Sequence, residues 1–147
     1  MRSVVQRVLQ ASVQITEHSD LVTTGAIDKG LLVLVGFGHD DLAKDAELFF
    51  DRLLKLRIFE DDSGKMNRSV ADVKGGVLIV SQFTLLADLS KGNRPSFGSA
   101  ASPERAVMLY DHLIQYATTK HSMVQSGRFG ADMKVSLVND GPVTIVM

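Results

Sequence analysis

Apolar and polar residues alternate in some stretches of the chain and form unbroken apolar runs in others. Residues 3–16 alternate, as in one bent strand or two short strands with a buried face. Residues 30–38 and 75–80 are apolar runs that begin with glycine, which is typical of strands buried on both faces. Two β-branched runs, 135–138 and 143–147, flank an Asn-Asp-Gly-Pro sequence. The pattern therefore predicts a sheet with two fully buried strands.

Two other segments carry apolar residues at helical spacing. The first runs from about residue 41 to 56, and Asp40-Asp41 supplies carboxylates suited to a helix N-terminus. The second runs from 103 to about 119 and begins with a strong start signal, Ser-Pro-Glu at 102–104. The order of elements predicts a single α+β domain over residues 1–147, with mainly antiparallel β-sheets packed by two helices.

Composition fits such a domain. The chain has 147 residues, of which 45% are hydrophobic and 22% charged, enough for a real core. It has no cysteine, which excludes disulfides and thiolate chemistry and agrees with a cytoplasmic location. No apolar run reaches the roughly 18 residues of a membrane span, and residues 1–15 lack the features of a signal peptide. We therefore expect a cytoplasmic protein with no membrane partner.

Charge and histidine spacing narrow the possible partners. The net charge of −1 argues against a broad basic face for nucleic acid, although a pocket for a single nucleotide end remains compatible with it. The four histidines, at positions 18, 39, 112 and 121, are scattered and lack the spacing of a metal site. We expect no metal and no other cofactor.

Polar residues appear abruptly where the second buried run ends. Ser81, Gln82 and Thr84 offer two hydroxyls and an amide, with no charge among them. Strand ends are common places for binding and catalytic sites. The alternative is that these side chains only satisfy nearby backbone groups.

A long irregular loop is predicted from residue 87 to 102. Lys91 and Arg94 give it local positive charge, which is useful for binding phosphates. Loops of this length in small domains are usually functional or mobile. A solvated loop without a ligand is the competing interpretation.

The Gly141-Pro142 step can place backbone groups in an unusual direction. Glycine permits backbone angles that other residues avoid, and the bond before proline is the one peptide bond for which cis is cheap. Such a hinge can turn main-chain carbonyls outward. An ordinary turn between two strands is the alternative.

The candidate segments contain no histidine and no evident pair of nucleophile and base. An enzyme built this way would position a water molecule with neutral dipoles or use a group of its substrate. Such a site suits a labile activated ester, for which positioning and a main-chain oxyanion hole suffice, and not a stable amide.

Five segments, in the same order and across essentially the whole chain, resemble D-aminoacyl-tRNA deacylases. They are residues 4–8, 81–85, 91–97, 127–133 and 139–144. The resemblance implies a β/β/α sandwich or barrel-like fold with helices on one side. It also implies hydrolysis of the ester that joins a D-amino acid to the 3′ end of tRNA. Glycine mischarged on tRNA(Ala) is an expected second substrate, because glycine has no chiral centre.

The same resemblance implies a homodimer that binds the 3′ end of aminoacyl-tRNA. Gly141 and Pro142 of one subunit would enter the pocket of the other, accept hydrogen bonds from the substrate ammonium and leave no room for an L side chain. Arg7 would hold this segment in place. A surface charge is the alternative interpretation of Arg7.

The remaining roles implied by the resemblance concern the ester and the terminal adenosine. Ser81, Gln82 and Phe83 would line the ester, and Thr84 is the candidate nucleophile. Phe129 and Met133 would contact the adenosine, as an aromatic and a soft apolar group suited to a base.

Two mechanisms and two other functions remain open. Because no base is visible beside Thr84, we favour the hypothesis that the 2′-OH of the terminal ribose orients or activates water. The alternatives to a deacylase are a non-catalytic dimer that binds RNA ends and a Thr-dependent hydrolase of small esters.

Overall fold

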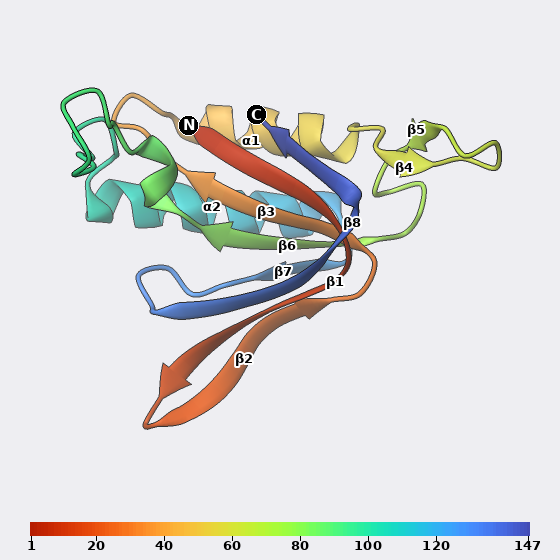
Figure 1. Cartoon of the computed structure of the whole chain (residues 1–147), viewed down its shortest axis with the longest axis horizontal. Helices are drawn as coiled ribbons and strands as arrows, with labels where there is room; N and C mark the ends of the chain where they lie inside the picture. Colours follow the sequence, from red (N-terminus) through yellow and green to blue (C-terminus); the bar gives the residue numbers. More distant parts are fainter.

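One long bent strand, β1 (Arg2–Glu17), is the centre of the fold. The structure is a computed structural model that describes residues 1–147 (Figure 1). The first half of β1 pairs antiparallel with β3 (Gly30–Gly36), and the second half with β2 (Asp20–Ile27). The last strand, β8 (Met133–Val146), pairs antiparallel with both halves. β1 is therefore one bent strand rather than two short ones.

The sheet continues from β3 with two parallel neighbours. β3 pairs with β6 (Gly76–Ser81), and β6 pairs with β7 (Val124–Ser126), both in parallel. The strand order is β2-β1-β3-β6-β7, with β8 on the other edge of β1. Antiparallel pairing is confirmed around β1, and the sheet as a whole is mixed. β2 curls back toward β7, so that a Cβ on Gly25 would lie 2.8 Å from Ser126 O, and the sheet nearly closes like a barrel.

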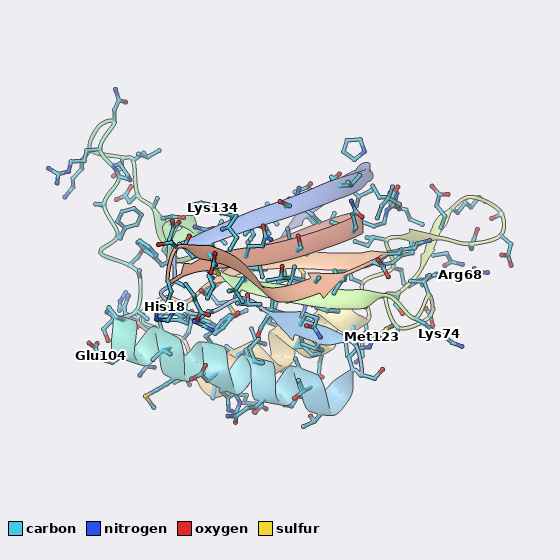
Figure 2. The ribbon with its side chains drawn as sticks, turned by 90° about the horizontal axis from the view of Figure 1, so that it is seen from below. His18, Arg68, Lys74, Glu104, Met123 and Lys134 are labelled. Atoms are coloured by element: carbon cyan, nitrogen blue, oxygen red, sulfur yellow. The ribbon has the colours of Figure 1, made fainter.

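Both helices cover one face of the sheet, while β8 lies toward the other (Figure 2). They are α1 (Ala43–Leu54) and α2 (Pro103–Lys120). The main core lies between helices and sheet and includes Phe50 and Leu113. A smaller core on the opposite face includes Leu32 and Leu78. Because side chains alternate along a strand, β3 and β6 supply both cores, and the prediction that they are buried on two faces is confirmed.

The predicted start of the second helix is confirmed, and that of the first is wrong. Ser102 Oγ accepts a hydrogen bond from Arg105 N (3.4 Å), as an N-cap does. Asp41 instead accepts from Gly38 N (2.6 Å), so α1 begins later, after Leu42. A carboxylate engaged by the preceding turn is not available to cap the helix.

Short elements complete the chain. β4 (Phe59–Glu60) and β5 (Met66–Arg68) form a separate hairpin, and η1 (Phe83–Leu86) is a 3-10 helix that follows β6. The two runs around Asn-Asp-Gly-Pro belong to one strand, β8, and not to two strands joined by a turn. Neither helix is long and apolar enough to cross a membrane.

Candidate functional site

The end of β6 is fixed by its parallel neighbour β3. Ser81 lies opposite Val35, and Gln82 N donates to Val35 O (2.7 Å) before the chain turns into η1. A Cβ on Gly36 would lie 2.6 Å from Gln82 O, closer than real Cβ atoms approach. Glycine at this position therefore lets the backbone around Gln82 pack directly on β3.

The side chains at this strand end contact one another. Gln82 Nε2 donates to Thr84 Oγ1, and this is the only hydrogen bond made by the exposed hydroxyl. An amide N–H cannot take up a proton, so the contact orients the hydroxyl without activating it. The structure therefore brings no charged group and no base into hydrogen-bond contact with the Thr84 hydroxyl.

Phe83 connects the strand end to the long loop. Its ring is 56% exposed and meets the ring of Phe97 edge-on, with centroids 5.0 Å apart. Ser99 Oγ donates to Leu86 O (3.1 Å), which ties the end of the loop to η1. The loop predicted from residue 87 to 102 contains no helix or strand, and its two ends lie against the candidate site.

Phe129 and Met133 lie beside the same end of β6. Gly127 N donates to Ile79 O (2.9 Å), and a Cβ on Gly127 would lie 2.6 Å from Met133 Sδ and 3.7 Å from the side chain of Val80. Met133 thus fills a space that glycine leaves next to β6. The structure therefore brings Phe129 and Met133 close to the strand that ends at Ser81.

A cavity of about 430 Å³ borders Phe129. Its lining includes Tyr110 and the polar residues Asp111, Gln115 and Arg128. The Tyr110 ring packs on Phe129 with centroids 5.9 Å apart, and its hydroxyl donates to Ile79 O (2.8 Å). Burial raises the pKa of this hydroxyl, so it remains a donor that fixes the ring. Only three of its nine lining residues are hydrophobic, so it is an open, mainly polar groove beside Phe129.

The Gly141-Pro142 segment forms a second, separate group with Arg7. The peptide bond between Gly141 and Pro142 is cis, Gly141 has φ +126°, and both residues are exposed. Arg7 is only 4% exposed, which overturns its interpretation as a surface charge. Its guanidinium donates to Asp140 O (3.2 Å) and to Ile58 O (2.6 Å), and it lies 3.0 Å from Asp140 Oδ2.

Asn139 holds the other side of this segment. Its Oδ1 accepts from Val143 N (2.9 Å) and its Nδ2 donates to Val143 O (3.1 Å), so one side chain spans the bend. The sequence alone predicts for Asn139 only a place in a turn. The residue type itself favours this contact, because Asn side chains readily form hydrogen bonds with backbone groups a few residues further on.

These two groups are far apart within one chain. Gly141 belongs to β8 and Ser81 to β6, three strand spacings apart through β1 and β3, or about 14 Å. Arg7 lies opposite Leu31 and Ser81 opposite Val35, four residues along β3, or about 13 Å. No group of three or more acidic, His or Cys side chains that could hold a metal is present.

Comparisons with known proteins agree over the full chain. Residues 4–147 match the family model described as D-Tyr-tRNA(Tyr) deacylase. A D-aminoacyl-tRNA deacylase of Anaeromyxobacter dehalogenans (strain 2CP-C) is 55% identical, with 100% of this chain and 96% of that protein covered. One of Variovorax paradoxus (strain S110) is 54% identical, with 99% and 97% covered.

Solved structures show the same architecture. The c-Myc DNA Unwinding Element Binding Protein has a TM-score of 0.91 at 39% identity, with 100% of this chain and 97% of that chain covered. A probable eukaryotic D-amino acid tRNA deacylase has a TM-score of 0.83 at 18% identity, over 99% and 97%, and so supports the fold alone. By its family match and its full-length relatives, the chain belongs to the D-Tyr-tRNA(Tyr) deacylase family.

Proposed function

We propose that this protein hydrolyses the ester bond of D-aminoacyl-tRNA and releases the free D-amino acid and tRNA. The match of residues 4–147 to the deacylase family carries the proposal. The neutral site at the end of β6 supports it, since an activated ester needs a positioned water and a polarised carbonyl more than a strong base.

The ester would lie at Ser81, Gln82 and Phe83, with the terminal adenosine at Phe129 and Met133. All five residues lie around the end of β6 or the strand segments beside it. The start of η1 leaves its first N–H groups without a partner inside that helix, and these are suitable donors to a carbonyl oxygen. Water would attack with help from the 2′-OH of the terminal ribose, and Thr84 would position groups rather than form an acyl-enzyme.

Chirality would be read by the main-chain carbonyls of Gly141 and Pro142. They would accept hydrogen bonds from the substrate ammonium, which every amino acid shares, and exclude the side chain of an L-amino acid. Arg7 and Asn139 support this role because they hold the backbone on both sides of the exposed dipeptide. Glycine on tRNA(Ala) would also be hydrolysed, because it has no side chain to exclude.

A homodimer would bring these two groups together. Within one chain they lie about 14 Å apart across the strands and about 13 Å apart along them, too far to contact one aminoacyl ester. Insertion of Gly141-Pro142 into the pocket of a partner subunit removes this separation. Large exposed apolar side chains on β8 and β1 support such an interface: Leu9, Leu137, Val138 and Val146.

Hydrolysis of D-Tyr-tRNA and L-Tyr-tRNA, compared side by side at catalytic enzyme concentration, tests the proposal. We expect cleavage of the D form and survival of the L form. Cleavage of both would mean an esterase without the chiral filter. Cleavage of neither would mean a protein that binds RNA ends without turnover.

A further inference from the structure

The loop between η1 and α2 carries two cations, and its one carboxylate, Asp88 at the base, is hydrogen-bonded to Ser90. From Leu89 to Pro103 the sequence contains two cations, Lys91 and Arg94, and no acidic residue. Both side chains are exposed. No ion pair in the molecule involves them, whereas Arg7, Arg68, Arg128 and Lys134 each pair with a carboxylate. Both cations are therefore available to an anion from outside the chain.

The segment has a closed base and a projecting tip. Asp88 N donates to Ser96 O (2.8 Å) and Ser96 N donates to Asp88 O (3.0 Å), which closes residues 88–96 into what we call the basic loop. At the tip, Gly92 N donates to Leu89 O (3.2 Å) with Gly92 at φ +127°, an angle that favours glycine. Figure 1 shows this green segment extending beyond the end of the sheet.

The base of the loop is fastened to the ester site. Phe97, just after the loop, packs on Phe83, and Ala87, just before it, donates to Thr84 O (3.0 Å). Arg2 adds a third cation here, since its side chain donates to Leu85 O (3.1 Å). Lys91 follows Ala87, the residue after η1, by four residues, so its backbone lies within about 14 Å of Ala87. At about 3.4 Å per nucleotide, that distance spans roughly four nucleotides of a stacked single strand.

We propose that the basic loop binds the RNA backbone immediately upstream of the aminoacylated nucleotide, with Lys91 and Arg94 as phosphate ligands. This inference rests on the proposed function, because it names the part of the substrate held outside the ester pocket. Lysine acts as a point charge and arginine as a planar fork, and both suit phosphate oxygens. The contact reads no base, so it serves aminoacyl-tRNAs of any sequence.

The test uses two substrates that differ only in the RNA backbone. One is D-Tyr-tRNA, and the other is D-tyrosyl adenosine, which has the ester but no phosphate. We expect the Lys91→Ala/Arg94→Ala double variant to lose about tenfold or more in kcat/KM on D-Tyr-tRNA, chiefly through KM. Its rate on D-tyrosyl adenosine should equal that of the wild type. The matched control is Arg52→Ala/Lys55→Ala at the C-terminal end of α1, where both side chains are exposed, and it should change neither rate.

Salt dependence gives a second readout that a merely structural loop would not change. Loss of two single-strand phosphate contacts should reduce the slope of log kcat/KM against log salt by about 1.4. The Lys91→Arg/Arg94→Lys variant keeps both charges and should restore most of the rate. Equal loss on both substrates, or no loss on D-Tyr-tRNA, would overturn the inference. Failure of the wild type to hydrolyse D-Tyr-tRNA would instead overturn the proposed function.

Discussion

At the scale of single residues, the candidate site contains a hydroxyl without a base. Thr84 Oγ1 receives its only hydrogen bond from the amide of Gln82. Thr84 lies just after a strand end, where nucleophiles are often found. It differs from a typical nucleophile because no base contacts its hydroxyl. The chemistry that remains is the positioning of water and the polarisation of the ester carbonyl.

Thr84→Ala should therefore retain a deacylation rate on D-Tyr-tRNA close to that of the wild type. By contrast, a substrate whose terminal ribose lacks the 2′-OH should react about a hundredfold more slowly, since a positioned proton-transfer group is worth that much or more. Single-turnover kinetics measures both rates. A large loss in Thr84→Ala, together with an acyl group trapped on Thr84 of the wild type, would establish a covalent mechanism instead.

At the scale of elements, the parallel pair β3 and β6 sets the position of the proposed ester site. The backbone at Gln82 packs on Gly36 at a distance that leaves no room for a Cβ. Any side chain at position 36 must therefore displace the strand end or η1.

Gly36→Ala should lower the free energy of unfolding by about 2 kcal/mol, as overpacking of a tight contact does, and should reduce deacylation. Gly98→Ala is the matched control, because a Cβ there meets nothing within 4 Å and φ is not positive. Urea denaturation and hydrolysis of D-Tyr-tRNA measure the two effects. If both variants unfold at the same urea concentration, the tight packing of Gln82 on β3 is not a constraint.

Local signals in the sequence were sufficient to predict most elements. The Ser102 cap bonds an N–H only three residues away. The apolar runs of β3 and β6 form adjacent strands that are buried on both faces. Apolar spacing alone does not fix the inner face of α2, because the apolar Met108 is 72% exposed while Tyr110 is buried. The apolar stripe of a helix predicts its buried face only to within about one residue, until the elements that pack on the helix are known.

The candidate site shows where such local signals end. Arg7 is buried by contacts with Ile58 and Asp140, which are 51 and 133 positions away in the sequence. The alternation of residues along β1 predicts which face of the strand Arg7 occupies. It does not predict that Arg7 contacts backbone carbonyls so far away in the sequence. The hydrogen bonds between Asn139 and Val143, and the cis isomer of Gly141-Pro142, likewise depend on how β8 pairs with β1.

At the scale of the whole molecule, the proposed homodimer with a shared active site predicts complementation. Gly36→Ala disturbs the proposed ester pocket. Gly141→Ala disturbs the segment proposed to read chirality, since its Cβ would lie 2.9 Å from Arg7 Nη2 at φ +126°. In a twofold dimer, a mixed pair has one site with both halves intact. Co-refolding equal amounts of the two variants should give about a quarter of the wild-type activity, because half of the dimers are mixed.

Each variant alone is the control for this measurement, and the mixture should exceed the mean of the two. A mixture that only matches this mean would place both halves of the site in one subunit. Sedimentation of the mixture checks that dimers have formed.

The pairing of β8 with β1 also has a consequence for the newly made chain. β1 emerges from the ribosome early and β8 late, and residues 144–146 pair with residues 4–6 near the opposite end of the sequence. Contacts so distant in sequence form only after most of the polypeptide exists. The dipeptide that we propose distinguishes mirror images would therefore be ordered last. Met133, the proposed adenosine contact, begins the same strand, so a prematurely terminated product would lack both. Substrate binding and stereochemical fidelity in this protein would thus depend together on complete synthesis.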